Sequence, residues 1–254
     1  GSMEQWDGQF GPGIVNAVNC TDRAIDLAKE HGMGLVALRN TNHWMRGGTY
    51  GWRAADAGCI AILFTNTQPN MPPWGGDTPS LGNNPFVLAI PHQDEHIVLD
   101  MAMSQYSYGK LEWYKRHGQQ LPEYGGYDRA NRLTKDPSEI LESERILPMG
   151  LWKGSAMSLL LDLTAAILAG GSTSRVIGSG ETETDLSQVF IALDIQQFMD
   201  NPRLERLIEE TLHFNITANP EVRYPGQRSL EERITNRSEG IEVTEEVWNE
   251  IARL

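Results

Sequence analysis

The chain has 254 residues, of which 40% are hydrophobic and 22% are charged, as in an ordinary folded globular protein. Its formal net charge of −13 repels nucleic acid and anionic membranes, so we expect neither as a partner. The two cysteines, Cys20 and Cys59, have no metal-binding spacing, and we expect reduced thiols, no metal and a cytoplasmic location.

The predicted elements of the first half alternate between helix and strand. Residues 1–3 resemble a cloning remnant, and residues 4–254 are predicted to form a single domain. A helix is predicted over 12–32, between a proline near its start and a glycine at its end. Strands are predicted over 34–40 and 59–67, with a short helix over 49–58. A loop rich in proline, glycine and asparagine follows over 68–85.

The second half mixes the same two kinds of element. Strands 86–91 and 96–104 are joined by a polar turn, and a helix around 108–116 precedes turn-rich polar sequence. The most apolar helix is predicted over 154–171, and further elements are predicted in this order: strand 186–195, helix 202–214 and helix 244–254. No apolar run reaches membrane-spanning length and no signal peptide is recognised. The pattern indicates mixed α and β structure without a regular βαβ alternation.

Familiar nucleotide motifs are missing. The stretch GPGIVN (11–16) has two of the three glycines of a dinucleotide fingerprint, but no predicted strand precedes it and Asn16 replaces the last glycine. The stretch GLWKGS (150–155) has its glycine and lysine in the wrong order for a P-loop. Neither GxSxG nor HExxH occurs.

His43 is the first candidate for chemistry. It follows a predicted strand end, where polar site residues are often displayed, and its imidazole exchanges a proton near neutral pH. Asn40 and Asn42 could orient the ring; the alternative is a buried histidine satisfied by backbone groups. A surface role is favoured for the remaining histidines, which are His31, His92, His96, His117 and His213.

Two arginines and two glycines surround His43. Arg39 and Arg46 could each grip a carboxylate through two parallel hydrogen bonds, although a surface ion pair is the alternative for either one alone. Gly47 and Gly48 allow close approach of the backbone to a ligand, or they form a plain turn.

Three later stretches carry further polar candidates. In LDMAMS (99–104), Asp100 could accept from ribose hydroxyls and Ser104 could donate to a phosphate, unless both only cap a strand end. In LWKGSAMS (151–158), Lys153 at a helix start points to a bound anion. In YPGQRS (224–229), a turn leads into a helix, and Gln227 and Arg228 could face a ligand or cap that helix.

Together these stretches resemble the malate/L-lactate dehydrogenase family, which is distinct from the Rossmann lactate dehydrogenases, and within it the 2,3-diketo-L-gulonate reductase branch. The resemblance runs from EQWDGQ to VTEEVWNEIARL, and its most specific motifs are GLVALRNTNHWMRGGTYGW, MPPWGG, LDMAMS, SYGKLE, ILPMGLWKGSAMS and RYPGQR. It implies an α/β, α+β-like fold in which a largely antiparallel mixed sheet, flanked by helices, binds NAD(P)H without a Rossmann motif. It also implies a homodimer.

The resemblance implies a reaction as well. The substrate would be a 2-oxo acid, most specifically 2,3-diketo-L-gulonate reduced to 3-dehydro-L-gulonate, with hydride from NADH or NADPH and a proton from His43. Arg46 or Arg39 could hold the substrate carboxylate. The positions that match the family's cofactor contacts are Thr67, Asp100, Met101, Ala102, Ser104, Trp152, Lys153, Gly226, Gln227 and Arg228.

The start of the chain departs from the family pattern. Family members carry a helical segment with a Ser-His-Gly motif ahead of EQWD, and this sequence contains no such motif. Two alternatives therefore stand beside the reductase: an inactive cofactor-binding or dimer-forming remnant, and a malate, lactate or ureidoglycolate dehydrogenase of the same family.

Overall fold

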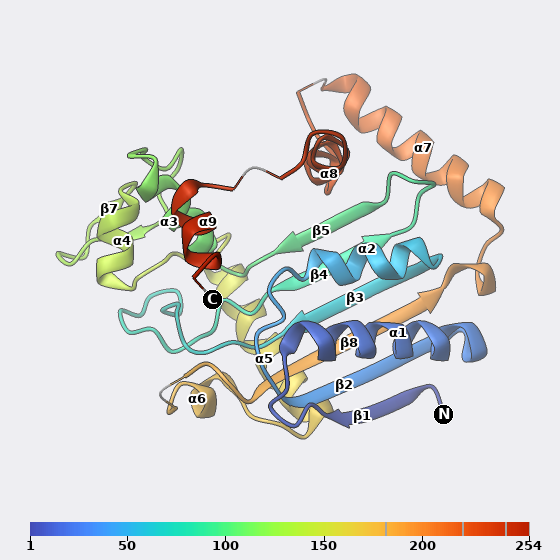
Figure 1. The fold of residues 1–254 in the computed structure, drawn as a ribbon, viewed down its shortest axis with the longest axis horizontal. Helices are drawn as coiled ribbons and strands as arrows, with labels where there is room; N and C mark the ends of the chain where they lie inside the picture. Colours follow the sequence, from blue (N-terminus) through green and yellow to red (C-terminus); the bar gives the residue numbers. More distant parts are fainter. Residues whose placement is uncertain (181, 220, 242, 254) are drawn as a thin grey trace.

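A six-stranded sheet forms the centre of the computed structural model, which describes residues 1–180, 182–219, 221–241 and 243–253 (Figure 1). Its strands follow the order β1 (Met3–Asp7), β2 (Met33–Thr41), β8 (Leu186–Asp194), β3 (Cys59–Thr65), β4 (Phe86–Ile90) and β5 (Ile97–Met101). β1 runs parallel to β2, and the other neighbouring pairs are antiparallel. The expected largely antiparallel mixed sheet is confirmed.

Helices cover both faces of this sheet. α1 (Gly13–His31) and α2 (Gly48–Asp56) pack on one face, and α5 (Trp152–Ala169) packs on the other (Figure 1). Side chains alternate along β2, so Val36 joins the core beneath α1 and α2 while Ala37 joins the core beneath α5. The sheet thus separates two apolar cores.

The contact between α1 and β2 depends on small residues. Ala17 and Ala24, two helical turns apart, are buried against the sheet. A Cβ at Gly34 would lie 2.0 Å from the Ala24 carbonyl oxygen, so β2 approaches the helix more closely than any larger residue permits. α1 ends at Gly32, whose φ of 85° is open to glycine at little cost.

β1 is a strand that the sequence analysis does not predict. It pairs with β2 from Met3 opposite Leu35 to Asp7 opposite Arg39. The carbonyl of Ser2 accepts a hydrogen bond from the Leu35 amide at 2.8 Å, so residues interpreted as a cloning remnant take part in the edge of the sheet.

β4 and β5 form the predicted hairpin, but the turn between them is covered. His92 and His96 are only 8% and 4% exposed. Glu205 of α7 (Asn201–Ala218) bonds to Nδ1 of His92 at 2.5 Å, and Asp56 of α2 bonds to Nε2 of His96 at 2.9 Å. The surface role expected for these two histidines is wrong, because helices remote in sequence close over the turn.

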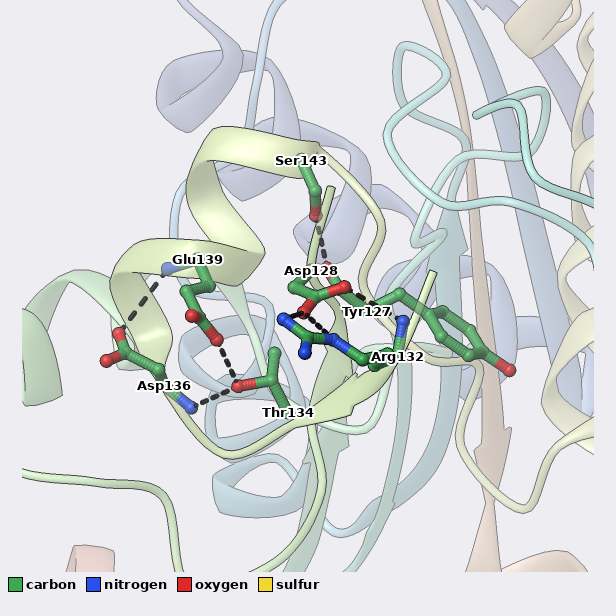
Figure 2. Close-up of polar contacts among 7 residues, drawn as sticks. All are labelled: Tyr127, Asp128, Arg132, Thr134, Asp136, Glu139 and Ser143. Carbon is green, nitrogen blue, oxygen red and sulfur yellow. Dashed lines mark hydrogen bonds and ion pairs between the residues drawn. The ribbon is translucent and has the colours of Figure 1, made fainter. Parts of the chain in front are cut away.

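Between β5 and α5 lies a small lobe, in which the predicted helix around 108–116 is confirmed and short elements occur within the turn-rich sequence expected after it. Its elements are α3 (Tyr108–Arg116), β6 (Gly126–Tyr127), β7 (Leu133–Thr134) and α4 (Pro137–Ser143). Asp136 caps the start of α4, because its carboxylate accepts from the Ser138 amide and from the Glu139 amide; Figure 2 shows the second bond. The backbone and side-chain N–H groups of Arg132 donate to Asp128 and lower the pKa of its carboxyl group. Short-range caps of this kind hold the lobe together.

α7 and α8 (Gln227–Glu239) lie past the edge of the sheet formed by β5 (Figure 1). The other remaining described helices are α6 (Ser174–Ile177), a 3-10 turn (Ile195–Gln197) and α9 (Glu245–Ile251). α8 starts within the YPGQRS motif as predicted, and the Pro225 carbonyl accepts from the Val98 amide of β5 at 2.9 Å. The predicted helix 244–254 is confirmed as far as Ile251; Leu254 lies outside the described residues.

Within the described residues, α5 alone is long and apolar enough to span a membrane by length and composition. Its inner face packs on the sheet, where the buried Asp162 carboxylate accepts from the Asn66 side chain and the Ser174 amide. Such internal satisfaction of a carboxylate is typical of a core helix in a folded domain. Its outer face leaves apolar side chains exposed, namely Trp152, Leu159, Leu160, Leu163 and Ile167.

Candidate active site

Buried aromatic contacts hold the segment that contains His43. β2 changes register just before its end, where Asn40 has a φ of 53°. The ring of Trp44 packs in the core against Tyr50 and Phe190. The Tyr50 hydroxyl donates to the Trp44 carbonyl at 2.7 Å, and burial raises the pKa of Tyr50 to about 12. Tyr50 is therefore a structural donor that anchors the loop.

His43 itself is half-buried, and the backbone orients its ring. Nδ1 accepts a hydrogen bond from the Met45 amide at 2.9 Å. A nitrogen that accepts carries no proton in the neutral imidazole, so the proton resides on Nε2. Asn40 and Asn42, suggested by the sequence as partners of the ring, instead bond to the Asp7 carboxylate and to backbone carbonyls.

Asp100 lies at the end of β5 and reaches the start of α2. Its Oδ2 accepts from the Gly48 amide at 2.8 Å, which places a negative charge at the positive end of the helix. A Cβ at Gly48 would lie 2.9 Å from the same oxygen, so this approach requires glycine. No described residue bonds to Oδ1 of Asp100, which stays available for a ligand hydroxyl.

Arg46 connects the His43 loop to α8. Its Nη2 donates to the Ser229 hydroxyl at 2.9 Å. Gly226, with a φ of 95°, precedes α8 and lies against β5, where a Cβ would come within 3.0 Å of the Val98 amide nitrogen. The structure therefore gathers the His43 loop, the end of β5 and the YPGQRS turn. Ser229 was not among the predicted site residues, although it belongs to that motif.

Gln227 and Arg228 occupy the first turn of α8. Gln227 donates to Glu231 at 3.2 Å, and Arg228 pairs with Glu232 at 2.9 Å, each within the same helix. Arg228 and its partner are exposed, and such pairs contribute about 0–1 kcal/mol. Arg228 can therefore turn toward a ligand at little cost.

Backbone hydrogen bonds join the segment after Asp100 to the start of α5. The Met149 amide donates to the Met103 carbonyl at 2.8 Å, and the Gly154 amide donates to the Met149 carbonyl at 2.8 Å. Ser104 forms a bridge with Pro148, and its hydroxyl donates to the Tyr106 carbonyl. These contacts bring together the predicted cofactor residues Met101, Ala102, Ser104, Trp152 and Lys153.

Lys153 and Trp152 lie in the exposed first turn of α5. Within the described residues, no carboxylate oxygen lies within 4.0 Å of the Lys153 ammonium group. A cation at a helix start opposes the helix dipole, whereas an anion bound beside it removes that penalty. The indole of Trp152 is 63% exposed and offers a flat apolar surface next to the charge.

Thr67 lies in the interior, in the loop that contacts α5. It is 2% exposed, and its hydroxyl faces the side-chain oxygens of Asn83 at 3.1 Å and Asn84 at 3.4 Å. Asn84 donates in turn to the Ser158 hydroxyl of α5 at 3.0 Å. The two asparagines support the loop under the site; their only sequence signal is the NNP end of the predicted loop.

Arg39 is the predicted site residue that the structure places elsewhere. Its Nε bonds to Asp7 at 3.3 Å, and its Nη1 lies 3.5 Å from the Ala169 carbonyl at the end of α5. A cation there complements the negative end of that helix. Arg39 therefore does not join Arg46 and Asp100.

The fold is shared with solved enzymes that act on hydroxy and oxo acids. Malate dehydrogenase from Entamoeba histolytica has a TM-score of 0.88 and 27% identity, over 98% of this chain and 76% of that chain. Sulfolactate dehydrogenase from Methanocaldococcus jannaschii has a TM-score of 0.81 and 30% identity, over 96% and 73%. These enzymes define the class of the fold, the oxidoreductases of hydroxy or oxo acids.

Sequence comparison identifies the family. The profile described as malate/L-lactate dehydrogenase matches residues 1–252. The chain is also 44% identical over 260 aligned residues to 2,3-diketo-L-gulonate reductase of Escherichia coli, covering 100% of this chain and 78% of that protein. The chain belongs to the malate/L-lactate dehydrogenase family.

Proposed function

We propose that the protein is an NAD(P)H-dependent reductase of a 2-oxo sugar acid, converting 2,3-diketo-L-gulonate to 3-dehydro-L-gulonate. The 44% identity to a reductase of that name supports the choice of substrate. The observation that carries the chemistry is His43, half-buried, with Nδ1 held by the Met45 amide and Nε2 without a described partner.

The donor set fits a nicotinamide dinucleotide. Lys153 supplies a cation that no described carboxylate pairs with, Oδ1 of Asp100 can accept from a ribose hydroxyl, and Trp152 offers an apolar face for a ring. When bound, the reduced nicotinamide supplies hydride to the ketone carbon. The proposed contacts are Thr67, Asp100, Met101, Ala102, Ser104, Trp152, Lys153, Gly226, Gln227 and Arg228.

His43 is the proposed proton donor. To act as an acid the ring must first take up a second proton at Nδ1, and this breaks the bond from the Met45 amide because two N–H groups cannot share one hydrogen bond. Nε2–H then donates to the carbonyl oxygen as the alkoxide develops. Exchange with water restores the Nε2–H form, and the Met45 contact re-forms.

Arg46 is the proposed partner of the substrate carboxylate. It lies three positions after His43, and its guanidinium group makes a hydrogen bond only to the Ser229 hydroxyl among the described residues. Arg39 is the weaker candidate because Asp7 and the end of α5 already engage it.

A homodimer and a cytoplasmic location complete the proposal. The outer face of α5 exposes Leu160 by 59% and Ile167 by 73%, and contiguous apolar surface of this kind is typical of an interface. Cys20 and Cys59 are free, buried thiols, as in proteins of reducing compartments.

The direct test is a spectrophotometric assay. The purified protein is mixed with 2,3-diketo-L-gulonate and either NADH or NADPH, and the nicotinamide absorbance is followed. We expect a decrease that depends on the substrate. A flat trace with both cofactors, alongside an active Escherichia coli relative, would contradict the proposal and leave the cofactor-binding remnant.

The solved relatives support a second candidate within the same class. Because the structures named malate and sulfolactate dehydrogenase share the fold, a simpler 2-hydroxy acid is an alternative substrate. A panel of malate, lactate, sulfolactate and ureidoglycolate distinguishes the two, since a higher kcat/KM for any of them than for 2,3-diketo-L-gulonate favours the second candidate.

A further inference from the structure

A cavity of about 540 Å³ lies between α2 and α8, beside the His43 loop. Arginine side chains from both helices and from the loop line it, namely Arg46, Arg53, Arg233 and Arg237, together with the acidic residues Asp56 and Glu232. A cationic cavity is unusual in a chain whose net charge is −13.

Both acidic groups of the cavity have hydrogen-bond partners, and one of its arginines, Arg53, is paired with Asp22. Asp56 bonds to His96 at 2.9 Å, and Glu232 bonds to Arg228 at 2.9 Å. Within the described residues, Arg233 and Arg237 have no carboxylate oxygen within 4.0 Å. The two arginines of α8 therefore carry positive charge that no described carboxylate pairs with directly.

The arginines of α8 are also placed to share one ligand. Arg233 and Arg237 are four positions apart and so lie on the same side of the helix, where like charges repel unless an anion separates them. The Arg233 guanidinium group lies 5.2 Å from the centre of the Trp52 ring, which supports it from α2. Arg46 is tied to Ser229 and closes the cavity from the loop.

We infer that this cavity binds a phosphate dianion between Arg233 and Arg237 of α8, at a site apart from the atoms that react. Phosphate oxygens match the fork of a guanidinium group and accept from several at once. The anion would also fasten α8 to α2. Since α8 begins at Gln227 and Arg228, and Arg46 belongs to the His43 loop, occupancy would change cofactor affinity, and by linkage the cofactor would change phosphate affinity.

Binding of inorganic phosphate to the full chain tests the inference, measured by calorimetry with ionic strength held constant by chloride. We expect one saturable site and at least tenfold weaker binding in the double variant Arg233→Gln, Arg237→Gln. The matched control is Arg203→Gln, Arg206→Gln, which removes the same charge from exposed positions of α7 outside the cavity. No saturable binding, unchanged affinity in the first variant, or an equal loss in the control overturns the inference.

A second titration identifies the source of the phosphate. If the group is the 2′-phosphate of NADPH, inorganic phosphate competes with NADPH and not with NADH. If it is a separate phosphate-bearing molecule, inorganic phosphate still binds saturably when either NADH or NADPH is present. Only the coupling to the cofactor rests on the proposed function. Phosphate binding is measured without turnover, so an inactive reductase leaves this test intact.

Discussion

The Asp100 carboxylate accepts a hydrogen bond from the Gly48 amide at 2.8 Å, although 52 positions separate the two residues in sequence. This contact joins the end of β5 to the start of α2. It therefore fixes the position of Gly48, in the loop after His43, relative to Asp100, the proposed ribose contact.

Gly48→Ala is expected to break this contact, because the added Cβ would lie 2.9 Å from Oδ2. A carboxylate at a helix start contributes about 1 kcal/mol. If Asp100 holds the ribose, we expect the KM for the cofactor to rise roughly fivefold, since 1.4 kcal/mol corresponds to tenfold. The control is Gly109→Ala in α3, where a Cβ meets nothing within 4 Å. Similar kinetics for both variants would disprove the role of the contact.

His43→Ala is expected to lower kcat at least about 100-fold, which is the lower range for loss of a general acid. The dissociation constant of the cofactor, measured by fluorescence titration, should stay within about twofold because no proposed cofactor contact is removed. His117→Ala, at an exposed position of the small lobe, serves as the control. Equal loss of turnover and cofactor binding would show that His43 is structural.

The Met45 contact makes a spectroscopic prediction about the resting enzyme. At a pH where His43 is neutral, long-range proton–nitrogen correlation spectra should show Nε2 protonated and Nδ1 unprotonated. His43→Asn identifies the resonance by its disappearance. A protonated Nδ1 in the neutral ring of the resting enzyme would contradict the hydrogen bond from the Met45 amide.

Asp7 should make stability depend on pH in the acid range. The Gln9 amide, followed by the Asn40 side chain, holds the pKa of Asp7 below its ordinary value. A lowered pKa in the folded state stabilises the protein above the unfolded pKa of about 3.9, and this stabilisation is lost as pH falls through the folded pKa. Urea denaturation of Asp7→Asn should therefore differ from wild type near neutral pH and converge with it in strong acid. Parallel curves at every pH would refute the assignment.

The outer face of α5 predicts the oligomeric state. Ile167→Glu places a charge where 73% of an apolar side chain is exposed, so a dimer that uses this face should dissociate, and sedimentation should give the monomer mass. Val176→Glu in α6 changes an exposed apolar residue outside α5 and should leave the dimer intact. A wild-type monomer, or a dimer insensitive to Ile167→Glu, would rule out this interface.

Elements that carry their own periodicity are predictable from this sequence. α1, β3 and α5 have strong apolar patterns, and their strand or helix assignment depends little on the rest of the chain. β1 is different, because five largely polar residues become a strand only by pairing with β2 about thirty positions later. α4 is also not predictable from the sequence, since an aspartate followed by a proline, as at its start, is equally typical of a turn.

The sequence predicts which residues belong to the candidate site better than it predicts the side chains to which they bond. His43, Asp100 and Lys153 stand out as polar residues at element ends. The choice between Arg39 and Arg46 depends on Asp7 and Ser229, which are distant in sequence and close only after folding. The same holds for His92 and His96, whose burial depends on Glu205 and Asp56.

Gly154 has a consequence for engineering this enzyme. A Cβ there would lie 2.3 Å from the Met149 carbonyl oxygen and 2.8 Å from that of Met103, so no other amino acid fits while both carbonyls keep their places. A mutagenesis library aimed at cofactor preference should therefore hold position 154 constant and diversify Trp152, whose side chain is open to solvent.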